Sequence, residues 1–256
     1  MYEWQLELIR ALQVISNGFT DAIFKGITMM GDEIFFIGLA AVLFICFDKK
    51  FGFKLIMVFL LSSFIVDLMK DGFMVDRPYI LDPSVGIGSP TEGYSFPSGH
   101  TMTATMLFGM TALWLIKTYK LTGKKKAWTY ATAGILIFLV AFSRMYLGQH
   151  FLTDVAAGFL VGAVTILLYL VLDRLFKGRE VYWTAIIVPA IVLMIVFPQQ
   201  KNYYMAAGVI ASVASGYFIE KKFVRYDVKE KWYVQIIKAV VCLGIAFLIK
   251  DGLKPL

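Results

Sequence analysis

AWTYATAGILIFLVAFSRMYLGQHFLTDVAAGFLVGAVTILLYLVL, residues 127–172, contains two long apolar runs that are separated by a short polar turn. Each run has roughly the 20 residues that an α-helix needs to cross the hydrocarbon core of a bilayer. The turn holds a glutamine and a histidine, and an arginine lies at the end of the first run. The stretch therefore predicts two consecutive transmembrane helices with ionisable residues where they meet.

The whole chain has the composition of a membrane protein. Of its 256 residues, 59% are apolar and 17% are charged, and its mean hydropathy is +0.72. Soluble domains are about half apolar and about a quarter charged, so this composition argues against a water-soluble fold. It also excludes a disordered chain and a disulfide-stapled module. The two cysteines, Cys46 and Cys242, lie inside apolar runs and are expected to be buried thiols.

Further apolar runs predict an all-α, polytopic membrane helical bundle with about seven to eight spanning helices. The expected spans are residues 34–47, 53–69, 102–116, 127–146, 151–172, 181–197, 203–219 and 232–249. We expect three parts: an N-terminal segment 1–30, a core 31–180 that carries the chemistry, and additional C-terminal helices 181–256.

The N-terminal segment has the pattern of an amphipathic helix. Glu3, Glu7 and Arg10 repeat at helical spacing, Trp4 and Leu8 belong to another face, and an Asn-Gly pair at residues 17–18 breaks the pattern. This pattern is typical of a helix in the membrane interface, followed here by a second short helix. A first spanning helix that tolerates a few charges is the alternative.

The distribution of positive charge predicts the orientation of the chain. Sixteen of the 25 lysines and arginines fall in alternate loops, which places these loops in the cytoplasm and the loop 73–97 and the turn 147–150 outside it. No Arg-rich tract with interleaved aromatic residues is present, so nucleic acid is not an expected partner. The sixteen are Lys49, Lys50, Lys54, Lys117, Lys120, Lys124, Lys125, Lys126, Arg174, Lys177, Arg179, Lys221, Lys222, Arg225, Lys229 and Lys231.

One of the two histidines opens the third expected span, in the run Phe96-Pro97-Ser98-Gly99-His100. Proline fits the first turn of a helix, and the free N–H groups of such a terminus bind anions, phosphate especially. A helix start in which Pro97 and Ser98 only cap the helix is the alternative.

The other histidine, His150, lies four residues before Asp154, within hydrogen-bond reach on one helix face. A carboxylate on one imidazole nitrogen fixes the tautomer and leaves the other nitrogen as a base or nucleophile. Arg144 ends the preceding span, and Gly148 is expected to break the helix between them. A structural pair that ties two helix ends together is the alternative, although ionisable pairs in a membrane are usually functional.

A third cluster is Lys70 to Pro78, in which Lys70 ends the second span and Arg77 begins the outer loop. Arginine binds an oxyanion through its bidentate fork and lysine binds it as a point charge. Snorkelling of basic residues at the membrane boundary is the alternative.

Taken together, the pattern K-x6-R-P, then P-S-G-H, then S-R-x5-H-x3-D resembles the type 2 phosphatidic acid phosphatase superfamily. Its members most similar in layout are the membrane lipid phosphate phosphatases, including bacterial undecaprenyl pyrophosphate phosphatases. The motifs cover Lys70 to Asp154, and the resemblance does not extend over residues 180–256.

The resemblance implies a role for each motif residue. His150 would attack phosphorus to give a phosphohistidine, Asp154 would orient its ring, and His100 would protonate the leaving alkoxide. Fixed cations would replace a metal ion, so neither a metal nor another cofactor is expected. The implied phosphate cradle is Lys70, Arg77, Ser98, Gly99 and Arg144.

The resulting expectation is a metal-independent hydrolase of a lipid phosphate or isoprenyl pyrophosphate in the plasma membrane, with its site outside the cytoplasm. Phosphatidic acid, phosphatidylglycerophosphate and sphingoid phosphates present the same head chemistry, so the motifs define a substrate class. A lipid phosphotransferase with the same site and a phospholipid-binding transporter or scaffold without turnover are the alternatives.

Overall fold

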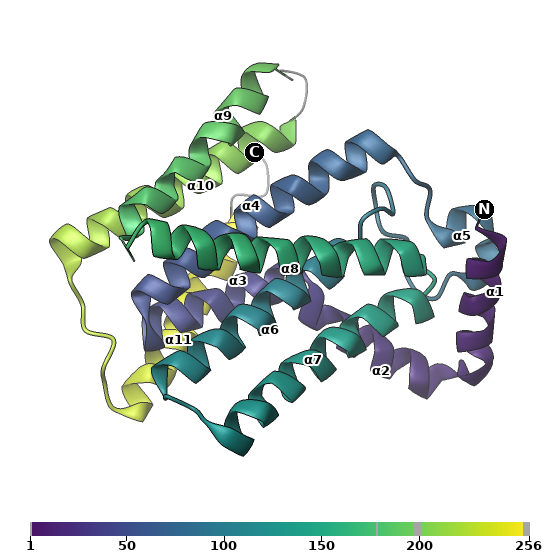
Figure 1. Ribbon diagram of the computed structural model, residues 1–256, viewed down its shortest axis with the longest axis horizontal. Helices are drawn as coiled ribbons and strands as arrows, with labels where there is room; N and C mark the ends of the chain where they lie inside the picture. The colour runs from purple at the N-terminus through teal and green to yellow at the C-terminus, as the bar shows by residue number, and fades with distance from the viewer. Residues whose placement is uncertain (1, 178, 197–200, 253–256) are drawn as a thin grey trace. The chain divides into compact units, whose positions relative to one another are not determined.

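The computed structural model describes residues 2–177, 179–196 and 201–252, and every regular element among them is helical (Figure 1). This confirms the all-α fold class for the described residues. The α-helices are α1 (Glu3–Leu12), α2 (Gly18–Thr28), α3 (Glu33–Val42), α4 (Lys49–Phe73), α5 (Pro78–Leu81), α6 (Gly99–Thr118), α7 (Gly123–Tyr146), α8 (Leu152–Leu175), α9 (Ile187–Val196), α10 (Lys201–Ile219) and α11 (Trp232–Gly252).

The chain packs as two compact units, each with its own interior. The first unit comprises Met1–Phe36 and Leu61–Arg174, and the second comprises Ile37–Leu60 and Leu175–Leu256. All the residues that the sequence analysis selects for chemistry belong to the first unit.

The expected spans fall in helical segments, except that Phe151 precedes α8 and residue 197 lies outside the described residues. Three described helical segments are long and apolar enough to cross a membrane: Lys49–Leu81, Gly123–Tyr146 and Leu152–Leu175. The pair Gly18–Gly31 and Glu33–Phe47, bent by 55°, gives a fourth candidate. The expected count of seven to eight spans is therefore not confirmed.

Two features of the sequence account for two of the expected spans that do not meet these criteria. The first half of α6 carries the polar residues that open the site, which lowers its hydropathy. Residues 181–197 do not form one helix, because a 3-10 segment, Glu180–Ile186, precedes the ten-residue α9. Pro189 has no N–H for the carbonyl of residue 185, so an α-helix cannot continue unbroken through this point.

The N-terminal segment forms two helices with the break where the sequence places it. The side chain of Asn17 accepts hydrogen bonds from the N–H groups of Phe19 and Thr20, in a capping box that starts α2. On α1, Leu6 and Ile9 are buried with Val85 and Phe151. Trp4 stays exposed, so the predicted interfacial position of this segment stays a prediction.

The break between α2 and α3 packs against the start of α6. Asp32 accepts a hydrogen bond of 2.8 Å from the N–H of Ile34 and so caps α3. A Cβ atom on Gly31 would lie 2.8 Å from the carbonyl oxygen of His100. Glycine therefore allows the backbones of the α2–α3 break and of α6 to approach closely.

The turn between α7 and α8 also depends on a glycine. Gly148 has a φ of +65°, in the left-handed region, and a Cβ atom there would lie 2.0 Å from the carbonyl oxygen of Val85. Only glycine accepts both conditions without strain. The predicted break of the helix at this residue is confirmed.

Three lysines of the second unit pair with carboxylates. Glu180 lies 3.2 Å from the Nζ atom of Lys50 and 3.4 Å from that of Lys221, and Lys49 lies 2.5 Å from Glu220. Of the two cysteines, both free thiols, Cys46 is buried and Cys242 is half-buried.

Candidate active site

Arg77 is the N-cap residue of α5 and is 2% exposed. Its guanidinium donates hydrogen bonds to the carbonyl oxygens of Gly93 at 2.9 Å, Glu92 at 3.0 Å and Gln149 at 3.2 Å. Its Nη1 atom also lies 3.3 Å from Nε2 of His150. Backbone carbonyl groups thus fix the arginine next to the imidazole. An arginine that snorkelled to the membrane surface would not be buried in this position.

The start of α6 carries the second motif. Ser98 is the N-cap residue, and its Oγ atom accepts hydrogen bonds from the N–H of Thr101 at 3.4 Å and from its hydroxyl at 3.0 Å. Helix α6 begins at Gly99, so Pro97 precedes the cap, and the expectation that it lies in the first turn is wrong. Ser98 therefore caps the helix, as one of the two interpretations of the sequence predicted. Its own hydroxyl proton takes part in neither of these hydrogen bonds.

Lys70 comes from the last turn of α4 and reaches the same helix terminus. Its Nζ atom lies 4.0 Å from the position that a Cβ atom on Gly99 would take. A side chain larger than hydrogen at residue 99 would therefore stand next to the ammonium. The terminus of α6 and this lysine present positive charge to the same space.

His150 lies in the turn before α8 rather than in its first turn, since α8 begins at Leu152. Its main-chain N–H donates to the carbonyl oxygen of Arg144 at 3.3 Å, which ties the histidine to the end of α7. Its Nδ1 atom lies 3.6 Å from Oδ2 of Asp154, and both side chains are buried. The predicted proximity of the histidine and the carboxylate is confirmed, although the two do not share a helix.

A serine that the sequence analysis did not select joins this pair. The Oγ atom of Ser95 lies 2.5 Å from Oδ2 of Asp154 and 3.3 Å from Nδ1 of His150. The same Oδ2 atom accepts a hydrogen bond of 2.7 Å from the N–H of Phe151. Two donors hold the carboxylate in place beside the ring. Ser95 directly precedes the run 96–100 that contains the P-S-G-H motif, and this position is the sequence feature from which its role could have been predicted.

These contacts define the tautomer of His150. Arginine has no acceptor, so a hydrogen bond between Arg77 and Nε2 requires an unprotonated Nε2. The proton then belongs on Nδ1, facing Asp154 and Ser95. Burial, followed by the charges of Arg144 and Arg77, holds the pKa of His150 well below its usual value. The ring is neutral at pH 7, and the electron pair on Nε2 accepts the hydrogen bond from Arg77.

Arg144 is 4% exposed and lies in the last turn of α7. Its Nη1 atom donates to the hydroxyl of Thr28 at 3.0 Å, whereas Nε and Nη2 are buried and make no hydrogen bond within the described residues. The charges of Arg144, Arg77, Lys70 and His100 all act on His150. The predicted cations and imidazoles thus converge in one place.

The second histidine faces a carboxylate that the sequence analysis also missed. The Nε2 atom of His100 lies 4.0 Å from Oδ2 of Asp32, and the imidazole is less buried than that of His150. Thr28 ends α2 and Asp32 lies in the break after it, both far in sequence from all three motifs. No spacing signal connects them to the site.

The fold and the site together define a class: helical membrane proteins with a buried, cation-lined histidine site that suits a phosphate-like anion. The chain belongs to the PAP2 superfamily, whose family model matches residues 51–177. A second model, described as the transmembrane extension of PAP2 superfamily phosphatases, matches residues 204–256.

Individual relatives agree with this assignment. Phosphatidylglycerophosphatase B of Bacillus subtilis is 30% identical over 66% of this chain and 82% of its own length. Undecaprenyl-diphosphatase of Sulfolobus acidocaldarius is 27% identical over 62% of this chain and 74% of its own length. Two longer relatives, from Arabidopsis thaliana and Dictyostelium discoideum, are matched over 49% and 42% of their lengths.

The fold is similar to a solved structure as well. The crystal structure of the first transmembrane PAP2-type phosphatidylglycerolphosphate phosphatase from Bacillus subtilis aligns with a TM-score of 0.59 and 27% identity. The alignment covers 67% of this chain and 85% of that one.

Proposed function

We propose that the protein is an integral membrane phosphatase that hydrolyses a lipid phosphate or an isoprenyl diphosphate through a phosphohistidine, without a metal ion. Family membership supports the hydrolase class and the lipid class of substrate. The mechanism and the face of the membrane on which it acts are inferred from the residues.

The observation that carries this proposal is that two of the three guanidinium nitrogens of Arg144 are buried without a partner in the described residues. These two are its Nε and Nη2 atoms. A buried charge with unused donors is costly, by about 1–3 kcal/mol for each unsatisfied group and more for a charged one. A phosphate group would supply the missing acceptors.

In the first step, Nε2 of His150 attacks phosphorus. A bond forms between Nε2 and phosphorus, and the bond between phosphorus and the lipid oxygen breaks. His100 gives a proton to the leaving oxygen, and Asp154 with Ser95 stabilises the positive charge that develops on the His150 ring. Lys70, Arg77, Arg144, the Ser98 hydroxyl and the Gly99 N–H then face the phosphoryl oxygens, where negative charge resides in the transition state.

In the second step, water attacks the phosphohistidine. His100, now neutral, takes a proton from the water, and the bond between phosphorus and Nε2 breaks to release inorganic phosphate. His150 regains its electron pair, and His100 regains its proton. The Oδ2 atom of Asp32 lies 4.0 Å from Nε2 of His100, next to the ring that exchanges this proton in each cycle.

The proposal is tested by phosphate release from phosphatidic acid in detergent with a metal chelator present. We expect His150→Ala to abolish release and Lys229→Ala, at an exposed position, to leave it unchanged. Activity that disappears with the chelator overturns metal independence. A phosphorylated alcohol in place of free phosphate, when glycerol is added, would instead establish a phosphotransferase.

We further propose that the protein lies in the cell membrane with its site on the face away from the cytoplasm. The support is the distribution of lysines and arginines among the loops. In a variant without native cysteines, Ser89→Cys in the loop 73–97 should react with an impermeant maleimide in intact cells, whereas Thr122→Cys should not. Labelling of Thr122→Cys alone would reverse the orientation.

A further inference from the structure

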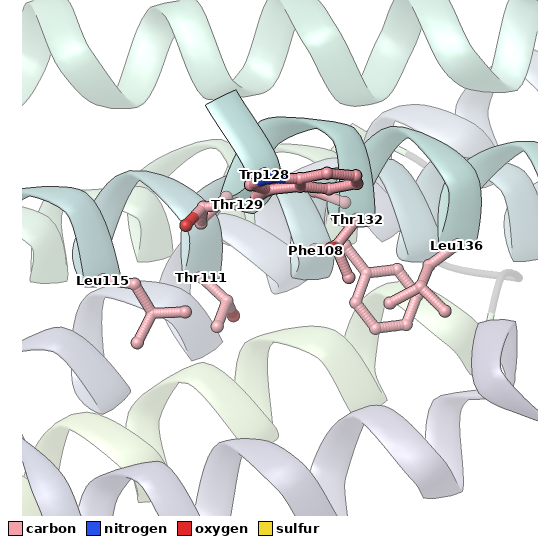
Figure 2. A pocket seen from close by; sticks show the side chains of 9 residues that line it. Phe108, Thr111, Leu115, Trp128, Thr129, Thr132 and Leu136 are labelled. Carbon is pink, nitrogen blue, oxygen red and sulfur yellow. The ribbon is translucent and has the colours of Figure 1, made fainter. Parts of the chain in front are cut away.

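A groove between α6 and α7 lies away from the candidate active site. The two helices pack along each other, and the groove between them has a volume of about 330 Å³. Figure 2 shows Phe108, Thr111 and Leu115 from α6, and Trp128, Thr132 and Leu136 from α7, around this space. At 1.5 Å per residue, Thr111 lies about 16 Å along α6 from His100. The groove therefore belongs to the opposite half of the helix pair.

The lining of the groove suits a hydrocarbon chain next to a polar group. It is mainly aliphatic and aromatic, and Trp128 at its end is 70% exposed. An exposed tryptophan at the end of an apolar helix is typical of the membrane interface. The hydroxyl of Thr111 is buried and has no hydrogen-bond partner in the described residues.

The segment that joins α6 to α7, just before Trp128 in the sequence, is rich in lysine. The sequence has five lysines and no acidic residue between Glu92 and Asp154. None of the five forms an ion pair in the described part of the chain, whereas Lys49, Lys50 and Lys221 of the second unit are all paired. The five are Lys117, Lys120, Lys124, Lys125 and Lys126.

Three of these lysines occupy an electrostatically unfavourable position. Lys124, Lys125 and Lys126 lie in the first turn of α7, where the helix macrodipole is already positive. Free N–H groups at that terminus add further donors. A bound anion would compensate both the lysines and the dipole.

We propose that this groove binds an anionic phospholipid, with one acyl chain along Phe108 and Leu136 and the phosphate on Lys124, Lys125 and Lys126. A zwitterionic lipid fits less well, because its headgroup would bring a cation next to three lysines. The site lies at the membrane surface opposite the candidate active site, so this lipid is not the substrate undergoing hydrolysis.

Quenching of tryptophan fluorescence by lipids with brominated acyl chains tests this site. The full-length protein is reconstituted into phosphatidylcholine vesicles that contain brominated phosphatidylglycerol or, in parallel, brominated phosphatidylcholine. We expect brominated phosphatidylglycerol to quench Trp128 more strongly than brominated phosphatidylcholine at equal mole fraction. The fluorescence of Trp128 is obtained as the difference between the wild-type protein and a Trp128→Phe variant. Equal quenching by the two lipids overturns the proposal.

Two variants separate the lysines from the groove. The triple variant Lys124→Gln, Lys125→Gln and Lys126→Gln should lose the preference for phosphatidylglycerol, at roughly fivefold in relative affinity for each charge removed. The variant Lys229→Gln with Lys231→Gln removes exposed charges elsewhere and should keep the preference.

Filling the groove tests where the acyl chain lies. Thr132→Phe, at an exposed lining position, should abolish the selective quenching of Trp128 while phosphate release stays normal, which reports a folded protein. If selective quenching persists in Thr132→Phe, the lipid is attracted by the lysines alone and the groove is not its site.

Discussion

Ser95 donates a hydrogen bond of 2.5 Å to Oδ2 of Asp154, the same carboxylate oxygen that lies 3.6 Å from Nδ1 of His150. The serine thereby fixes the carboxylate that fixes the imidazole. Because the N–H of Phe151 binds the same oxygen, its position relative to the ring is set by two donors from different segments. The orientation of Nε2 toward the cations depends on this chain of contacts.

Ser95→Ala should therefore lower kcat about 10–100-fold with little change in KM. A hydrogen bond to a charged group is worth about 1.5–3 kcal/mol, and its loss affects the ring charge that develops in the transition state rather than substrate binding. Steady-state phosphate release measures both constants. Ser95→Thr keeps the hydroxyl and should restore most of the rate, whereas an unchanged kcat in Ser95→Ala would remove the serine from the mechanism.

Asp32→Asn tests the proposed acid at His100. The amide keeps an oxygen to cap α3 but removes the negative charge near the imidazole. We expect about a tenfold loss of kcat with a lipid phosphate, whose alkoxide needs a proton to leave, and less than a twofold loss with p-nitrophenyl phosphate, whose leaving group does not.

A His100→Asn variant supplies the reference for this pattern. It should show the same dependence on the leaving group, only more strongly. If Asp32→Asn slows both substrates equally, the aspartate acts through the structure of the α2–α3 break and not through His100.

Sequence reasoning located the three motifs correctly because each lies at the end of an apolar run. Lys70, His100 and Arg144 fall at the ends of α4, α6 and α7, and alternating helices return such ends to one side of the bundle. The position of Gly148 was also predictable, since a glycine between two long apolar runs marks a helix break.

The missed residues depend on packing that no spacing encodes. Thr28 reaches Arg144 across 116 positions of sequence, and Asp32 reaches His100 only because α2 and α3 meet at a sharp angle. Ser95 differs, because it precedes a recognised motif, but its partner Asp154 lies 59 residues away. The number of spans could not be predicted from the apolar runs either, since hydropathy does not reveal the break before α9.

The depressed pKa of His150 predicts a specific pH dependence of stability. Between the folded pKa and the ordinary value of about 6.5, the unfolded chain binds a proton that the folded protein does not. Stability therefore falls as the pH drops below about 6.5, with a limiting slope of about 1.4 kcal/mol per pH unit for this one group. Above that range the group contributes no pH dependence.

Thermal unfolding in detergent at pH 7.5 and pH 5.5 checks this expectation. The Tm of the wild-type protein should fall more between these two values than the Tm of His150→Gln, which has no titrating ring at this position. An equal decrease in the two proteins would show that His150 titrates normally in the folded state.

Gly148→Ala tests how closely the turn beside His150 is held. The new methyl group would meet the carbonyl oxygen of Val85 at 2.0 Å, and alanine would be forced to a φ of +65°. Either the turn or the outer loop must move, and a displacement of about 1 Å at a reacting group costs about 100-fold in rate. We expect kcat to fall by at least that factor while the protein still inserts and purifies. Gly134→Ala, on the preceding helix α7, is the control, because no atom lies within 4 Å of its added methyl and helix propensity favours alanine there. Normal activity in both variants would mean that the turn does not position His150.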